Sequence, residues 1–187
     1  MNSTAQDIQV NTYAVDPSHS RLGFTVRHLG FSKVRGSFEN FEGIVRLDPD
    51  DLSTIEAEGT AQTASITTND EKRDAHLRSA DFFDADKYPT ITFKSTGVKD
   101  VDGSRFTLIG ELTMRGVTKE VEFEGEYLGA GRDPFGNDKI ALEARTTINR
   151  KDWGLNWNAA LETGGVLVSE HVDLELEIQA VLQNDEA

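Results

Sequence analysis

Apolar and polar residues alternate with a period of two along most of this chain. The clearest example is the segment at 172–181, whose two faces are Val172, Leu174, Leu176 and Ile178 against Asp173, Glu175, Glu177 and Gln179. Successive side chains of a β-strand point to opposite faces, so this pattern predicts strands with one dry and one wet face. Burial of even one unpaired carboxylate costs several kcal/mol, so the acidic faces must lie in water.

The alternation predicts about eight antiparallel strands. We expect them at 21–28, 33–47, 55–65, 91–95, 106–114, 121–127, 140–149 and 172–181. The segment 33–47 is expected to be one long strand with a bulge or bend at Gly36 or Gly43. Asp102-Gly103 and Arg115-Gly116 are expected to form hairpin turns, and 129–137 a polar loop. Strands that are dry on one side must close as an all-β barrel or stack as two sheets.

Composition limits the organisation and the partners. No repeat or low-complexity linker divides the 187 residues, which predicts a single domain over 1–187. The chain has no cysteine, which excludes disulfides, thiolate metal sites and thiol nucleophiles. The net charge of −14 makes nucleic acids and anionic membranes poor partners for the protein as a whole.

No apolar stretch approaches the roughly 18 residues of a membrane span, so stable membrane insertion is not expected. The first residues, MNSTAQDIQV, have neither a basic leader nor an apolar run. We therefore expect a cytoplasmic location for the chain as given, and a periplasmic or secreted one if a leader has been removed.

Small residues on one inner face indicate an internal cavity. The segment 55–65 presents Ala57, Gly59 and Ala61 where a packed core more often has valine or isoleucine. A barrel of eight strands is just wide enough to be filled by side chains or to hold one ligand. We favour a ligand; the alternative is that phenylalanines of facing strands fill the space.

A helical segment near 69–88 interrupts the alternation. Thr68 to Glu71 has the spacing of a capping box, and a helix is expected to run to about Leu77. Phe82 and Phe83 are expected to face the apolar interior. Arg73, His76 and Arg78 would gather at the rim and attract a polar head group, or else form ordinary ion pairs with Asp70, Glu71, Asp74 and Asp81.

Three further residues have two interpretations each. His28 shares a face with Phe24 and Val26, so it either meets a ligand in the cavity or is a hydrogen-bonded core residue. Trp153 and Trp157 lie four apart around Gly154. They either cover an opening and line a ligand tail, or plug the end of the barrel.

Six segments together resemble the YceI-like family, over roughly 12–182. They are YAVDPSHS at 13–20, FTVRH at 24–28, VRGSF at 34–38, DAHLRSADFFD at 74–84, YPTITF at 88–93 and LTMRGVTK at 112–119. The resemblance implies an extended lipocalin-like antiparallel β-barrel with a helical segment, which holds a polyisoprenoid or other lipid-like chain. It also implies periplasmic secretion in many members, and dimers. Residues 1–11 would then be a flexible start and 183–187 a tail.

Signatures of enzymes are weak in this sequence. The histidines at 19, 28, 76 and 171 have neither HxH nor HExxH spacing, and no GxSxG nucleophile elbow is present. The glycines at 129–136 are not followed by a helical pattern, as a phosphate loop would be. A metal site assembled from distant histidines stays an alternative.

The sequence therefore predicts non-enzymatic binding, sequestration or transport of a long-chain isoprenoid or similar lipid, of the prenyl phosphate or isoprenoid quinone type, with no cofactor and no metal required. The alternatives are an enzyme acting on a small lipid-like substrate in the same cavity, and a structural or stress-associated barrel without a ligand. The expected apolar ligand contacts are Phe24, Val26, Phe38, Phe41, Ala57, Ala61, Phe82, Phe83, Phe93, Leu108, Leu112, Phe123, Trp153, Trp157, Leu174 and Leu176. The expected head-group contacts are His28, Arg73, His76 and Arg78.

Overall fold

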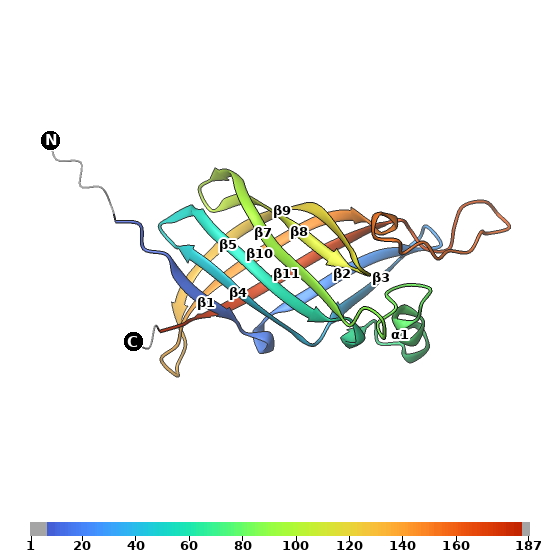
Figure 1. Cartoon of the computed structure of the whole chain (residues 1–187), viewed down its shortest axis with the longest axis horizontal. Coiled ribbons are helices and arrows are strands. Elements are labelled where there is room, and N and C mark those ends of the chain that lie inside the picture. Colours follow the sequence, from blue (N-terminus) through green and yellow to red (C-terminus); the bar gives the residue numbers. More distant parts are fainter. Residues whose placement is uncertain (1–6, 185–187) are drawn as a thin grey trace.

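The computed structural model describes residues 7–184 and consists mainly of antiparallel strands (Figure 1). The strands are β1 (Asn11–Val15), β2 (Arg21–His28), β3 (Ser32–Phe38), β4 (Phe41–Asp48), β5 (Asp51–Gln62), β6 (Ile66–Thr67), β7 (Thr90–Asp102), β8 (Arg105–Met114), β9 (Val117–Arg132), β10 (Asp138–Asn149) and β11 (His171–Leu182). The α-helix is α1 (Glu71–Arg78), and short 3-10 turns lie at Pro17–His19, Thr63–Ser65 and Arg150–Trp153. Part of the flexible start and of the tail expected from the sequence, 1–6 and 185–187, lies outside the described residues.

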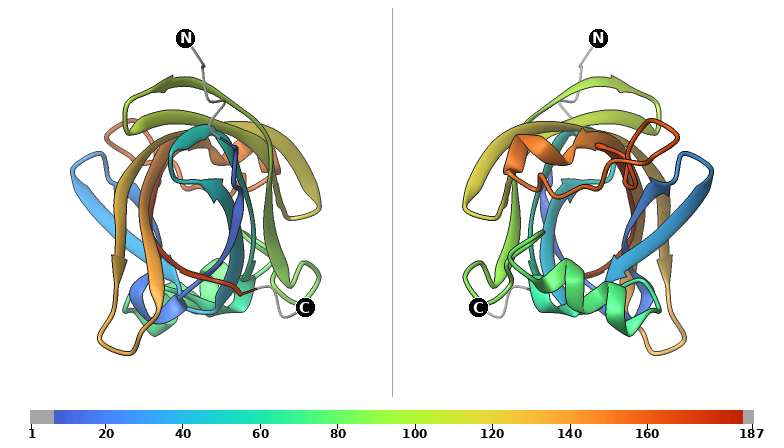
Figure 2. Two further views of the ribbon diagram at one scale, coloured as in Figure 1. Left: turned by 90° about the vertical axis from the view of Figure 1, so that its left-hand side faces the viewer. Right: turned by 90° about the vertical axis from the view of Figure 1, so that its right-hand side faces the viewer.

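Eight strands close the barrel, which confirms the fold expected from the alternation. The order β1-β4-β5-β7-β8-β9-β10-β11 is closed by pairing of β11 with β1. Strand β11 divides its second edge between two partners: residues 173–177 pair with β2 and residues 180–182 with β1. Strands β2, β3 and β6 extend the sheet from β11. Figure 2 shows the ring end-on, with α1 across one end.

The segment 33–47 is two strands rather than one, because the chain turns at Glu39 and Asn40. The backbone N–H of Glu39 donates to the carbonyl of Ser65, and that of Asn40 donates to the Ser65 hydroxyl. The bend expected at Gly36 or Gly43 is therefore made by hydrogen bonds to the turn after β5. Both glycines lie inside strands.

Two of the three turns or loops expected from the sequence are found at the expected residues. Gly103 has a φ of 58°, and Arg115 and Gly116 have φ values of 50° and 72°, as a tight hairpin requires. The loop expected at 129–137 is wrong in its first half, because residues 129–132 belong to β9. A register shift between Ala141 and Leu142 of β10 lets β9 continue, and the loop shrinks to 133–137.

The start of the helix also differs from the expected capping box. Asp70 is the N-cap, and its side chain accepts a hydrogen bond from the N–H of Arg73 at 3.0 Å. Asn69 has a φ of 61°, so Thr68 is turned away and donates instead to the buried Asp74 from its N–H and its hydroxyl, at 2.8 and 2.5 Å. Helix α1 ends at Arg78, and residues 79–88 form turns.

One half of the barrel has a filled core. Tyr13, Leu47, Leu52, Ile140 and Ala180 are all buried beside β1, and Leu47 and Ala180 are inaccessible to solvent. The described termini lie at this end, opposite α1 (Figure 1). We call this half the plugged end. Within residues 7–184, no helix has the length and apolar composition needed to span a membrane.

Candidate functional site

A cavity of about 420 Å³ occupies the other half of the barrel, towards α1. Its volume is in the range of small-molecule sites, and its wall is almost entirely hydrocarbon. All the apolar contacts expected from the sequence line this cavity except Trp153. The cavity has further lining residues that were not among the expected ligand contacts, including Leu22, Val34, Ile55, Ile91, Phe106, Met114, Leu142, Ile148, Leu155, Val172 and Ile178. Most of these follow the inward alternation of their strands, which is the signal that identifies them.

The cavity stays open because three of its phenylalanines lie against glycines. An added Cβ at Gly36 would stand 2.3 Å from Cζ of Phe24, and one at Gly125 would stand 2.3 Å from Cε2 of Phe106. A glycine in a strand permits this close approach of a ring to the sheet. The third ring, Phe93, covers Gly110 in the same way, at 2.4 Å. The rings therefore line the wall rather than cross the interior.

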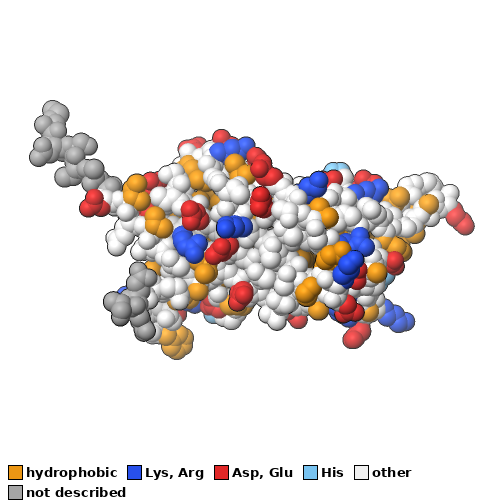
Figure 3. Space-filling view, in the orientation of Figure 1, with side chains coloured by type: hydrophobic (Ala, Val, Ile, Leu, Met, Phe, Trp, Pro, Cys, Tyr) orange, Lys and Arg blue, Asp and Glu red, His pale blue; other side chains and the backbone are white. Residues whose placement is uncertain are grey.

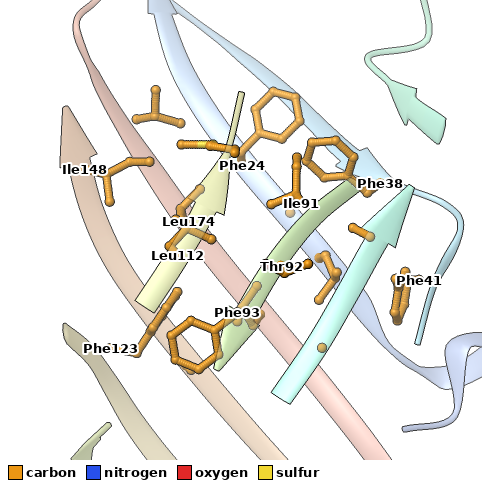
Figure 4. A pocket seen from close by; sticks show the side chains of 18 of the residues that line it. Phe24, Phe38, Phe41, Ile91, Thr92, Phe93, Leu112, Phe123, Ile148 and Leu174 are labelled. Carbon is orange, nitrogen blue, oxygen red and sulfur yellow. The ribbon is translucent and has the colours of Figure 1, made fainter. Parts of the chain in front are cut away.

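Figure 4 shows this wall, with Phe93 from β7 beside Phe123 from β9, and Leu112 and Leu174 further along the cavity. The Phe93 and Phe123 rings meet edge to face at 5.4 Å between centroids. Ala57, Gly59 and Ala61 of β5 also line the cavity. The small inner face of this strand thus borders open space.

Three aromatic side chains that line the cavity pack on one another at its α1 end, and we call His76, Phe82 and Trp157 the aromatic lid. The His76 ring lies 4.6 Å from Trp157 and 5.1 Å from Phe82, edge to face in both cases, and Phe82 lies 5.4 Å from Trp157. Beside the lid, Phe83 packs edge to face on Phe38 at 5.9 Å. Rings at these separations attract one another beyond their buried area.

Arg150 fixes the segment that carries Trp157. Its guanidinium is buried and donates to the carbonyls of Leu155 at 2.5 Å, Trp157 and Ser169 at 2.9 Å, and Val168 at 3.4 Å. Burial lowers the pKa of Arg150 from its ordinary value. No local pattern in the sequence marks this residue, because its partners are backbone atoms as many as nineteen positions away.

Arg115 joins the two parts of the closed end. It donates from Nη1 to the carbonyl of Gly154 and from Nη2 to that of Ala80, the latter at 3.0 Å. Trp153, expected as a ligand contact, does not line the cavity. Its ring is buried behind the cavity wall, because the indole N–H donates to the carbonyl of Leu112 at 3.0 Å.

The polar residues expected at the rim separate into two groups. His28, Arg73 and His76 border the cavity, whereas Arg78 does not. Positions 73, 76 and 77 share one face of an α-helix, and position 78 is turned about 100° away from 77. Arg73 donates to the hydroxyl and the carbonyl of Thr68 at 2.7 and 2.9 Å.

One of the ion pairs considered for this segment is present, since His76 Nε2 lies 2.8 Å from the Asp81 carboxylate. Asp70 and Asp74 are used instead as helix cap and as acceptor for Thr68. Within the described residues, no group of three histidine or acidic side chains has the arrangement of a metal site.

A serine, a histidine and an aspartate also meet outside the cavity, between β1 and β2. The Asp16 carboxylate accepts from the Ser18 hydroxyl at 2.6 Å, and lies 2.9 Å from His19 Nδ1 and 3.2 Å from Lys139 Nζ. Hydrogen bonds from Ser18 and His19 hold the pKa of Asp16 well below its usual range. The Ser18 hydroxyl also lies 3.0 Å from His19 Nδ1. The serine and the aspartate share this one ring nitrogen, so the imidazole does not stand between them as the base of a catalytic triad does, and the cluster stabilises the surface bend.

The chain matches known proteins over most of its length. A family model described as a YceI-like domain matches residues 13–180. The UPF0312 proteins SAS2572 and SAUSA300_2620 of Staphylococcus aureus strains MSSA476 and USA300 are each 40% identical over 167 residues, which is 89% of this chain and 95% of theirs.

Solved structures have the same fold. The crystal structure of Burkholderia cenocepacia BcnA is 22% identical, with a TM-score of 0.78 over 89% of this chain and 99% of that one. The Campylobacter jejuni YCEI protein is 28% identical, with a TM-score of 0.73 over 84% and 90%. A polyisoprenoid binding domain from Saccharophagus degradans is 16% identical, with a TM-score of 0.66 over 91% and 98%.

Proposed function

Because the chain belongs to the YceI-like family, we propose that it binds a long-chain isoprenoid or similar lipid inside the barrel and carries it without altering it. The observation that carries this proposal is the hydrocarbon-walled cavity with the aromatic lid at its α1 end. A cavity with this wall removes an alkyl or prenyl chain from water, which is worth about 0.8 kcal/mol for each buried methylene.

The distribution of polar groups orients the ligand. Its head group would lie near His28, Arg73 and His76 at the α1 end, and its tail would run along Phe93, Phe123 and the small residues of β5. Tail burial gives affinity with little selectivity. Cavity length and the head-group contacts would therefore select the ligand, with no cofactor required.

The arrangement of the lining favours binding over catalysis. Of the titratable groups at the α1 end, Arg73 and Arg150 are bonded to a threonine and to backbone carbonyls, and His76 is bonded to Asp81. The hydroxyls of Ser32 and Ser79 donate to the backbone carbonyls of His28 and His76. No serine or threonine hydroxyl is hydrogen-bonded to the imidazole ring of either histidine within the described residues, so a nucleophile with its base is not assembled there.

The test is extraction of protein that has been purified without detergent, followed by mass spectrometry of the organic phase and native mass spectrometry of the protein. We expect a long-chain lipid in wild type. Ala57→Phe places a ring in the cavity and should leave the protein empty, whereas Ala130→Phe, on the exposed part of β9, should retain the lipid.

Two results would contradict the proposal. Wild-type protein that is always empty and takes up no isoprenoid alcohol, quinone or fatty acyl amide would favour a structural barrel. Turnover of the extracted lipid that is abolished by His76→Ala, with binding retained, would favour the enzyme alternative.

A further inference from the structure

The β2–β3 hairpin differs in charge from the rest of the chain. Residues 17–38 contain no aspartate or glutamate but four basic residues, Arg21, Arg27, Lys33 and Arg35, in a protein of net charge −14. On the face shown in Figure 3, acidic and basic side chains are interspersed over the barrel. A stretch of this length with only positive charge is thus a local exception.

The basic side chains of this hairpin share its outer face. Arg27 pairs with Lys33 across the two strands, and Arg35 follows two positions later. All three are exposed, and none forms an ion pair within residues 7–184. They form what we call the basic patch.

The acidic face of β11 borders the other half of the hairpin. Near the distal half, Glu170 follows Ser169, whose N–H donates to the carbonyl of Arg27, and the Glu170 carboxylate is paired with Lys151 at 2.8 Å. The outer face of β11 places Asp173, Glu175 and Glu177 opposite Thr25, Gly23 and Arg21. Strand β11 does not pair with β2 beyond Thr25, so the distal half, with Arg27 and Lys33, extends past these carboxylates. The acidic residue of the adjoining 154–169 segment that is exposed nearby is Glu162.

Exposed apolar side chains lie at the tip of the same hairpin. Phe31 is 87% exposed, and Leu29 and Val166 are 40% and 44% exposed. The N–H of Leu29 donates to the carbonyl of Leu167 at 2.9 Å, which ties the tip to the segment that carries Trp157. The hairpin tip and this segment lie at the α1 end of the barrel (Figure 1). The aromatic lid borders the cavity at the same end.

We propose that the hairpin docks the cavity end of the protein onto a bilayer that contains anionic lipids, with Phe31 in the interface and Arg27, Lys33 and Arg35 against the head groups. Aromatic and basic residues together favour the surface of such bilayers. The segment 69–88 at the same end carries six acidic and four basic side chains. Charges are screened beyond about 8 Å at physiological ionic strength, so a contact through the hairpin itself would experience the basic patch more than the acidic face of β11.

This inference goes beyond the proposed function, because the hairpin can dock whether or not the cavity is filled. A bilayer is favoured over an acidic protein as the partner because the exposed aromatic ring of Phe31 lies at the end of the barrel where the aromatic lid borders the apolar cavity. Docking there would let an apolar ligand move between bilayer and cavity without crossing water.

The experiment is flotation of the purified full-length chain with phosphatidylcholine vesicles, with and without phosphatidylglycerol. We expect binding only with phosphatidylglycerol, weakened by added salt. Phe31→Ser, and Lys33→Gln combined with Arg35→Gln, should each reduce binding by about tenfold or more. The controls are Phe135→Ser, since Phe135 is 89% exposed at the plugged end, and Lys94→Gln combined with Arg105→Gln, which has the same change in charge.

A spectroscopic readout tests the position of the tip. A tryptophan introduced by Phe31→Trp should shift its emission to shorter wavelength on anionic vesicles, and one introduced by Phe135→Trp should not. Absence of wild-type binding, or equal loss in the control variants, would overturn the proposal. The proposal would also be overturned if the hairpin variants still bound vesicles but changed their oligomeric state. That result would assign the hairpin to a contact between protein chains.

Discussion

Replacement of Gly36 by alanine tests whether the glycine and phenylalanine pairs keep the cavity open. The new Cβ would stand 2.3, 2.8 and 2.9 Å from three atoms of the Phe24 ring. Ordinary contact begins at about 3.4 Å, so the ring tip must move by roughly 1.1 Å, the difference between 3.4 and 2.3 Å. The obstacle is the end of a side chain and the neighbouring space is the cavity, so Phe24 can swing inward.

The expected free-energy costs for folding and for ligand binding are both modest and similar in size. Overpacking of a core costs typically about 1–3 kcal/mol, and we expect the lower end because Phe24 has space to enter. A ring displaced into the cavity would exclude one or two methylenes of a ligand, or about 0.8–1.6 kcal/mol. This corresponds to a loss of affinity of roughly fourfold to fifteenfold.

Thermal unfolding followed by circular dichroism gives the first quantity, and titration with the apolar fluorophore phenylnaphthylamine gives the second. Gly110→Ala should be less stable than Gly36→Ala, because its Cβ would also meet the backbone carbonyl of Lys94 at 2.7 Å. Gly97→Ala is the matched control, since nothing lies within 4 Å of its Cβ. Unchanged probe affinity in Gly36→Ala, with wild-type stability, would refute the idea that these glycines maintain the cavity.

Three further predictions concern the lid and the bend. Arg150→Met should lower the free energy of unfolding by about 3 kcal/mol or more, because four carbonyls lose a buried donor. Urea denaturation measures this loss. The control is Lys151→Met, which removes an exposed ion pair and should lower the free energy of unfolding by about 1 kcal/mol at most. Trp157→Ala should speed dissociation of phenylnaphthylamine roughly tenfold in stopped-flow experiments, since it removes ring contacts of the lid. An unchanged dissociation rate would mean that the ligand does not leave the cavity past the lid. Asp16 has a depressed pKa, so its stabilisation is present above the ordinary carboxyl pKa of about 4 and is lost as the pH falls below it. Asp16→Asn should therefore be less stable than wild type at about pH 7 and should lose less stability on acidification, as measured by urea midpoints, whereas parallel pH profiles would contradict the assignment.

Local rules predicted the strands and most of the cavity wall. A strand with one buried face must alternate, so the inward residues, from Phe24 to Leu176, could be assigned without knowing which strands pair. The turns at Asp102-Gly103 and Arg115-Gly116 could also be predicted, since a tight hairpin needs a positive φ, which Gly103, Arg115 and Gly116 have.

Features that depend on distant partners could not be predicted in this way. The break at Glu39 and Asn40 depends on Ser65, and the burial of Trp153 depends on the carbonyl of Leu112. The role of Thr68 was mistaken because Asp70 and Thr68 both have side chains that can cap a helix, and only the fold shows which one meets the N–H of Arg73.

The filled half and the hollow half of the barrel contribute differently to the stability of the ligand-free protein. Atoms around a void lose dispersion contacts, so a barrel that is hollow throughout would be poorly stabilised without a ligand. Tyr13, Leu47 and Ile140 supply dense packing at the plugged end, and β11 runs through both halves. The plugged end can therefore act as a foldon that stays folded and shows slow amide hydrogen exchange. The hollow half can then open locally, bind a ligand and release it without unfolding of the whole barrel.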